Sequence, residues 1–299
     1  MTRLAKLLLM TIVATLADFS PARAADLVLH ASDPYVEAEI GGVRLKLKVM
    51  LDHAPGITLN PDAAARAGLG RGDGVWVEQI GPVKLRGRRA QLGFLVAGVP
   101  AEAKVRWHGG PAANDSDGHI SIDTLPFDSV TLERRPAGPQ ERDLAFETKL
   151  HHNHGVYIPI SAGRRRIAAR LSFSRARTSA PAAAGAALSA FHGGALDPEK
   201  SYEEISLGVA RPVWPLRLDR PVRLGGLAIP VIMVRASDFR GKHRLERRPD
   251  PAEEEIVVRG ERRSQDALYR ITVGLDVLGR CSAATYVRAT GALRLRCAL

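Results

Sequence analysis

An aspartate at the end of a strand, Asp52, is the first residue in this chain whose type and place suit it for chemistry. Residues 36–69 suggest a strand, a Gly-Gly turn and a second strand that runs into Asp52. Pro55 and Gly56 supply a sharp bend, because proline fixes φ and glycine tolerates positive φ. Asn60 then predicts the cap of a short helix that begins at Pro61. We take Asp52 as a candidate catalytic carboxylate.

The second candidate comes from an internal repeat. Residues 163–188 repeat the pattern around the bend and place Ser172 where the first copy has Asp52. Thr58 and Pro61 align with Thr178 and Pro181. Two more pairs of segments follow in the same order: 82–96 with 221–234, and 120–125 with 272–278, the latter aligned on Asp123 and Asp276. Three repeated segments in one order indicate a duplicated domain.

These motifs resemble those of the pepsin-like and retropepsin-like aspartic peptidases. In that family an Asp-Thr/Ser-Gly loop precedes a short apolar strand, and here the triplet is Asp52, His53 and Ala54. The segments 120–125 and 273–278 are similar to the family's Leu-Gly-x-Asp-x-Leu motif. The resemblance implies an all-β fold of two pseudo-symmetric β-barrel lobes with short helices, each lobe giving one loop to a shared site. It also implies that Asp123 and Asp276 are structural.

The expected organisation is a signal peptide at 1–24, a first lobe at 27–136, a linker at 137–143 and a second lobe at 144–299. The N-terminus is basic, then apolar for about a dozen residues, and ends in a small-x-small cleavage pattern. That run is shorter than the roughly 20 residues that span a bilayer. We therefore predict a periplasmic or secreted protein without a transmembrane segment. A charged insertion at 238–263 predicts a surface loop.

The chain is basic and otherwise has the composition of a globular protein. Hydrophobic residues make up 45% and charged residues 25%, and the formal net charge is +11. The charge favours a solvated, arginine-rich surface, although it would also suit an acidic partner. The sequence contains no nucleic-acid motif, and export argues against such a partner. The sequence does not fix the oligomeric state.

Histidines 151, 152 and 154 form the densest histidine cluster. In a strand, His152 and His154 would share one face, a spacing that can ligate zinc or copper. The nearby sequence offers no obvious third ligand. We therefore expect a solvated strand edge, no metal and no cofactor.

The two cysteines, Cys281 and Cys297, lie on either side of a predicted turn at 288–291. A hairpin there brings them to nearly opposite positions on adjacent strands, within disulfide reach. An exported protein permits the bond. We predict a Cys281–Cys297 disulfide, with a one-residue register slip as the competing outcome.

Cleft-covering hairpins are expected at 81–87 in the first lobe and at 211–215 in the second. Trp214 is the aromatic residue expected to touch a ligand, and its alternative role is to cover the edge of the core.

The chemistry of the family requires two carboxylates that share one proton. Two like charges so close cannot both ionise, so one acts as base and the other as acid. A lone aspartate ionises near pH 4 and cannot do both at pH 7. Ser172 could hold the attacking water but has no useful proton to give.

The sequence therefore favours an exported aspartic-peptidase-fold protein, hydrolytically impaired, that binds peptide or another extended ligand between its lobes. The alternative is an active aspartic-type endopeptidase that uses Asp52 with an atypical partner such as His53. Adjacent side chains diverge at a strand end, which weakens that dyad. Two further functions are considered. One is a serine hydrolase that uses Ser172 or Ser174 with His53 and Asp52, and the other is a purely structural envelope protein.

Overall fold

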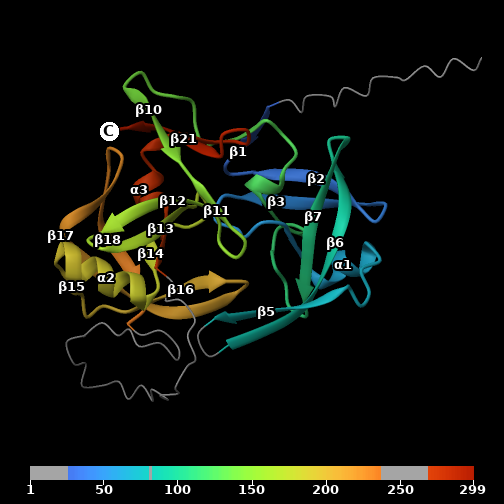
Figure 1. The fold of residues 1–299 in the computed structure, drawn as a ribbon, viewed down its shortest axis with the longest axis horizontal. Coiled ribbons are helices and arrows are strands. Elements are labelled where there is room, and N and C mark those ends of the chain that lie inside the picture. Colours follow the sequence, from blue (N-terminus) through green and yellow to red (C-terminus); the bar gives the residue numbers. More distant parts are fainter. Residues whose placement is uncertain (1–25, 81–82, 237–268) are drawn as a thin grey trace, which may run out of the picture.

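The computed structural model describes residues 26–80, 83–236 and 269–299, and most of its regular structure is β (Figure 1). The predicted signal peptide and charged insertion lie outside these residues. Within them, no helix is long and apolar enough to cross a membrane. The all-β prediction is confirmed, and the strands divide into two lobes and one sheet that joins them.

The first lobe is a sheet in the order β2-β3-β8-β4-β7-β6-β5, closed by a β2–β6 pairing into a barrel. Strand β3 alternates buried apolar and outward basic residues, the period-two pattern of a half-buried strand. Its elements are β2 (Tyr35–Ile40), β3 (Val43–Met50), β4 (Ile57–Leu59), α1 (Pro61–Arg66), β5 (Gly74–Ile80), β6 (Val83–Val96), β7 (Val99–His108), β8 (Gly118–Ser121) and the 3₁₀ turn η1 (Ile122–Thr124).

The second lobe contains a sheet in the order β11-β12-β13-β19-β14-β18-β17-β15, with β16 paired to β17. Its elements are β11 (Lys149–His151), β12 (Gly155–Ala162), β13 (Arg165–Leu171), β14 (Ser179–Ala180), α2 (Ala182–His192), β15 (Ala195–Leu196), β16 (Ser201–Ser206), β17 (Val209–Leu224), β18 (Leu227–Val234), β19 (Arg270–Val273) and α3 (Leu275–Leu278).

The two lobes share one pattern of strand pairing. β3 pairs in parallel with β8, and β13 pairs in parallel with β19. The short strand after each loop, β4 or β14, lies antiparallel to β8 or β19 and parallel to β7 or β18. A helix follows each short strand, and η1 or α3 follows β8 or β19. This equivalence places Asp52 and Ser172 in corresponding loops.

One of the three predicted segment pairs is wrong. Residues 82–96 lie almost wholly in β6, whereas 221–234 contain the end of β17, the Gly225-Gly226 turn and β18. By pairing, β6 corresponds to β17 and β7 to β18. The mistake has a physical cause: alternating strands of similar composition carry no mark of their place in a sheet.

A third sheet joins the lobes, in the order β1-β9-β20-β21-β10. We call it the bridging sheet; its strands are β1 (Leu27–His30), β9 (Ser129–Glu133), β10 (Glu141–Glu147), β20 (Cys281–Val287) and β21 (Ala292–Ala298). Strand β9 follows the first lobe and pairs with β20 from the chain's end. Residues 141–143, predicted as linker, instead begin β10 and pair with β21.

The predicted disulfide is confirmed within the bridging sheet. Cys281 and Cys297 are opposite residues of β20 and β21 and form an S–S bond of 2.01 Å. The pairing register shifts between Cys281 and Ala283, which marks a β-bulge. The anticipated one-residue shift in register therefore exists between β20 and β21. The β-bulge compensates for it, so that Cys281 and Cys297 are still opposite each other.

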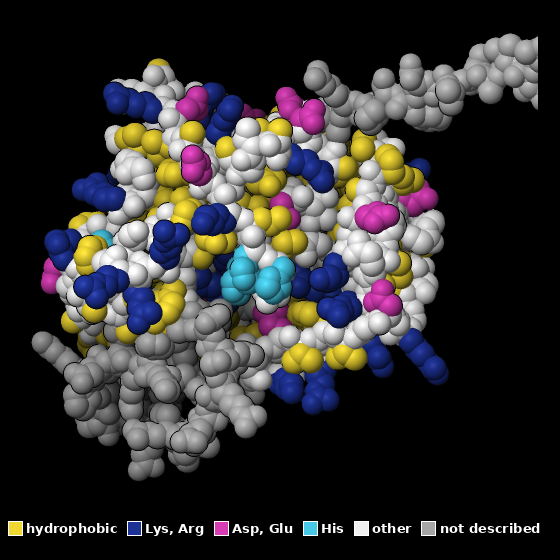
Figure 2. All heavy atoms as spheres, viewed as in Figure 1, with side chains coloured by type: hydrophobic (Ala, Val, Ile, Leu, Met, Phe, Trp, Pro, Cys, Tyr) yellow, Lys and Arg dark blue, Asp and Glu magenta, His cyan; other side chains and the backbone are white. Residues whose placement is uncertain are grey.

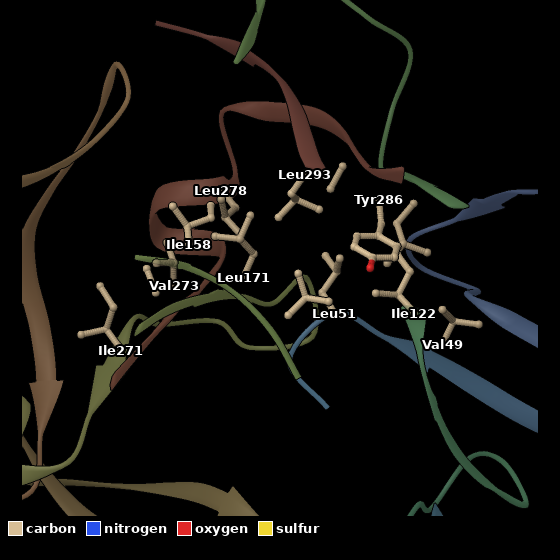
Figure 3. Packing of buried hydrophobic residues seen from close by; sticks show 14 of the residues in the cluster. Val49, Leu51, Ile122, Ile158, Leu171, Ile271, Val273, Leu278, Tyr286 and Leu293 are labelled. Carbon is tan, nitrogen blue, oxygen red and sulfur yellow. The ribbon is translucent and has the colours of Figure 1, made fainter. Parts of the chain in front are cut away.

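Buried apolar residues of both lobes and the bridging sheet form one hydrophobic core cluster. Figure 3 shows Leu51 and Leu171, the residues before Asp52 and Ser172, with Tyr286 and Leu293 of the bridging sheet close by. Leu51 and Leu171 are 4% and 2% exposed. The residues that precede the two candidate loops therefore belong to one packed interior.

Candidate functional site

Asp52 lies two residues after the end of β3 and is 7% exposed. Its Oδ2 accepts a hydrogen bond from Nε of Arg175, 3.1 Å away. Its Oδ1 is buried and has no hydrogen-bond partner in the described part of the chain. The partner that the structure gives this carboxylate is thus a guanidinium from the second lobe.

A second arginine crosses between the lobes beside the first. Arg170, the penultimate residue of β13, donates from Nη1 to the backbone oxygen of Asp52 (2.9 Å) and from Nη2 to Oγ1 of Thr272 (2.9 Å). Arg170 and Arg175 lie on either side of Ser172 in the sequence. The loop of Asp52 and the loop of Ser172 are therefore joined by these two side chains.

Ser172 is 1% exposed, and its hydroxyl shares a 3.0 Å hydrogen bond with the hydroxyl of Ser174. The backbone N–H of Ser172 donates to Val273. Each serine hydroxyl thus has the other as its side-chain partner, so the structure does not assemble a Ser-His-Asp triad at this loop.

His53 is engaged inside the first lobe. Its Nδ1 lies 2.8 Å from the backbone oxygen of Ala54 and its Nε2 lies 3.1 Å from Oγ1 of Thr58. A neutral imidazole that donates at one nitrogen and accepts at the other satisfies both contacts. Burial, and then the charge of Arg106, lowers the pKa of His53 well below its usual value. With both nitrogens occupied, His53 is not directed at Asp52 as a base.

Asp276 braces the loop of the second lobe. Its two oxygens accept hydrogen bonds from the backbone N–H (2.9 Å) and the hydroxyl (2.8 Å) of Thr178, which is fully buried. In the first lobe a different contact braces the loop: Oγ1 of Thr124 accepts a hydrogen bond from the N–H of Gly56 at 2.7 Å. Asp123 instead accepts a hydrogen bond from Ser121. Both aspartates contact their own lobe and not the carboxylate of Asp52.

The predicted helix start at Pro61 is confirmed, but Asn60 acts differently from a capping residue. Asn60 occupies the N-cap position of α1 without a side-chain hydrogen bond to the helix. Its Oδ1 instead accepts the N–H groups of Ala112 (2.7 Å) and Ala113 (2.9 Å), and its Nδ2 donates to the backbone oxygen of Ser116. Asn60 therefore fixes the loop after β7 against the first lobe.

Each predicted hairpin segment lies along one strand of a hairpin: residues 83–87 on β6 of the β5–β6 hairpin, and residues 211–215 on β17 of the β16–β17 hairpin. Residues 81–82, at the first tip, are outside the described residues. Arg175 holds the second hairpin, because its Nη1 and Nη2 donate to the backbone oxygens of Glu204 (2.6 Å) and Ile205 (2.8 Å). Trp214 is 4% exposed and packs in the core, so the expectation that it touches a ligand is wrong and its alternative role holds.

The histidine cluster lies in the β11–β12 turn and not along one strand face. The rings of His151 and His152 stack at 4.4 Å, and those of His151 and His154 at 4.5 Å. A Cβ on Gly155 would lie 2.0 Å from the backbone oxygen of His53, so this turn packs on the Asp52 loop. Figure 2 shows histidine side chains near the middle of this face. Among the described residues, no His, Cys, Asp and Glu group could hold a metal ion.

Buried arginines are the site residues that the sequence did not reveal. Arg106 and Arg170 are 8% and 9% exposed, contrary to the view of the basic residues as solvated surface. The available signal was local: Arg170 interrupts the apolar run of β13, where its neighbours Ala169 and Leu171 are buried. A charge at a buried strand position needs partners, and here they come from Asp52 and Thr272.

The comparisons with known proteins give little beyond the fold. No protein-family model matches the chain, and no curated protein matches it. Among solved structures, the solution structure of the simian foamy virus (mac) protease is similar, with 20% identity over 31% of this chain and 91% of that chain, at a TM-score of 0.25. The strand pairing defines the fold of this chain.

Proposed function

We propose that this chain is an exported, aspartic-peptidase-like binding protein that has lost peptide hydrolysis and holds a peptide or another extended ligand between its lobes. One observation carries the proposal: the carboxylate of Asp52 is bound by Arg175. The predicted signal peptide and the Cys281–Cys297 disulfide support a place outside the cytoplasm.

The pairing with Arg175 removes both halves of the peptidase mechanism. A guanidinium stands beside Asp52 where the mechanism needs a second carboxyl group, so Asp52 has no carboxyl partner with which to share a proton. A guanidinium offers hydrogen-bond donors and no acceptor, so Arg175 cannot serve as the base. Ser172, at the corresponding place in the second lobe, offers a hydroxyl already bonded to Ser174. Water activation and carbonyl polarisation therefore lack the two carboxylates that they need.

Ligand binding requires the surfaces between the lobes and does not require a second carboxylate. Two hairpins border the region between the lobes, and Trp76 of β5 is half-buried, with its ring 5.9 Å from that of His108. Neighbouring Val75 and Val77 are 58% and 50% exposed. An extended chain could contact these three side chains of β5 without cleavage.

The test is to incubate the mature chain with a mixture of unfolded peptides from pH 3 to pH 8 and to analyse the products by mass spectrometry. We expect no cleavage by the native chain or by Asp52→Asn, and retention of peptides on the immobilised protein. Trp76→Ala should weaken retention several-fold. Asp128→Asn, which changes an exposed aspartate, is the matched control.

Cleavage that Asp52→Asn abolishes and Asp128→Asn preserves would replace the proposal with the active endopeptidase. If the native chain neither cleaves nor retains peptides, the proposal is wrong and the structural envelope protein is the function that is left.

A further inference from the structure

A small cavity beside Asp52 is lined by four arginines, Arg170, Arg175, Arg235 and Arg270. Ser179 and Thr272 add hydroxyl groups, and Pro181, the N-cap of α2, brings the positive end of a helix to the rim. Its volume of about 30 Å³ holds roughly two water molecules and not a peptide. The side chains that give it polarity are overwhelmingly hydrogen-bond donors.

Two of these guanidiniums have only neutral partners. Arg175 is paired with Asp52. In the described residues, Arg170 donates to a backbone oxygen and to a hydroxyl, and Arg270 lies 3.0 Å from the ring nitrogen Nδ1 of His154. Nε of Arg170 is buried with no hydrogen-bond partner there. Burying charge without a counter-charge is costly.

The electrostatics agree with this geometry. Burial, and then the charges of Arg170 and Arg235, lowers the pKa of Arg270 to about 9. Burial also lowers the pKa of Arg170, against the opposing influence of Asp52. Glu78 on β5 is near enough to favour both charges, but no contact joins it to either arginine. An anion in the cavity would relieve the repulsion that remains.

We propose that this cavity binds a tetrahedral oxyanion, the phosphate or sulfate group of a ligand or the free ion. Free sulfate, or a phosphate monoester with nearly two negative charges at neutral pH, matches the charges of Arg170 and Arg270. Each guanidinium can donate two parallel hydrogen bonds to oxygens of such an anion. Oγ1 of Thr272 accepts a hydrogen bond from Arg170, so its own proton is free to donate to the anion. This site goes beyond peptide binding and does not depend on it.

The test measures the thermal midpoint of the full mature chain in phosphate, sulfate, acetate and chloride at equal ionic strength. We expect a concentration-dependent rise with phosphate and sulfate, as for any ligand of the native state. Arg270→Gln and Thr272→Val should each reduce the rise several-fold. Arg223→Gln, which changes an exposed arginine of the same lobe, should retain it. Thr272→Val carries the test if Arg270→Gln does not fold.

A phosphoserine tetrapeptide and its unphosphorylated form separate the two sources of the group. A shift at lower concentration with the phosphopeptide than with inorganic phosphate assigns an esterified group, and the reverse assigns the free ion. An equal rise with acetate, or a rise undiminished in folded Arg270→Gln and Thr272→Val, would overturn the site. Peptide retention is measured separately, so its failure would leave this result standing.

Discussion

Arg175 decides what Asp52 can do, because one side chain makes three contacts that belong to different parts of the molecule. Its Nε binds the carboxylate, and its other nitrogens bind the backbone of β16. The second lobe thus meets this carboxylate with a guanidinium and not with a second carboxyl group. The internal repeat in the sequence predicts corresponding loops for Asp52 and Ser172. The sequence does not reveal the arginines, because a charged side chain near a turn is usually solvated.

At the same scale, Asp276→Ala should destabilise the protein by about 2–4 kcal/mol, because it leaves the buried N–H and hydroxyl of Thr178 unsatisfied. Urea unfolding of both proteins measures the difference. Asp123→Ala is the matched control, with a loss of about 1 kcal/mol, since Thr124 and not Asp123 binds the N–H of Gly56. Equal losses would show that the loops are braced alike.

Turns and helix starts could be predicted, because nearby residue types determine them. Strand neighbours in a sheet could not, because they depend on pairing with distant parts of the chain. The turn at Gly41 and Gly42, both at positive φ, and the helix starting at Pro61 follow from residue type. The bridging sheet does not, because its strands come from both ends of the chain and the middle. Residues 141–143, the start of β10, are predicted as linker because the pairing of β10 with β21 spans about half the sequence. For the same reason, the sequence alignment of 82–96 with 221–234 is wrong: the pattern of a strand does not show which strand it pairs with.

The β16–β17 hairpin should loosen when Arg175 is replaced by Met. The substitution removes the hydrogen bonds to Glu204 and Ile205 while keeping a long side chain. We expect faster amide hydrogen exchange across β16 and the start of β17 than in the native chain. Arg217→Met, which removes an ion pair with Asp197 in the same lobe, should leave that exchange unchanged. Unaltered exchange in Arg175→Met would mean that strand pairing alone fixes the hairpin.

For the whole molecule, the interface between the lobes should make stability depend on pH. His53 in the first lobe and His154 in the second lie where the β11–β12 turn packs on the Asp52 loop. Burial, and then the charge of Arg270, lowers the pKa of His154 to about 3, and the pKa of His53 is also lowered. In the unfolded chain both titrate near pH 6.5. Below that value the unfolded state binds protons that the native state refuses, so stability falls as pH falls.

We therefore expect the urea midpoint to drop between pH 7 and pH 5, a window in which most carboxyl groups stay ionised. His154→Asn should reduce the drop, because it removes one group that protonates only on unfolding. His30→Asn, at an exposed position of β1, should show the drop of the native chain. A midpoint that is flat from pH 7 to pH 5, or a drop that His154→Asn leaves unchanged, would mean that His154 accepts its proton in the folded protein. The contact with Arg270 would then have to break without cost.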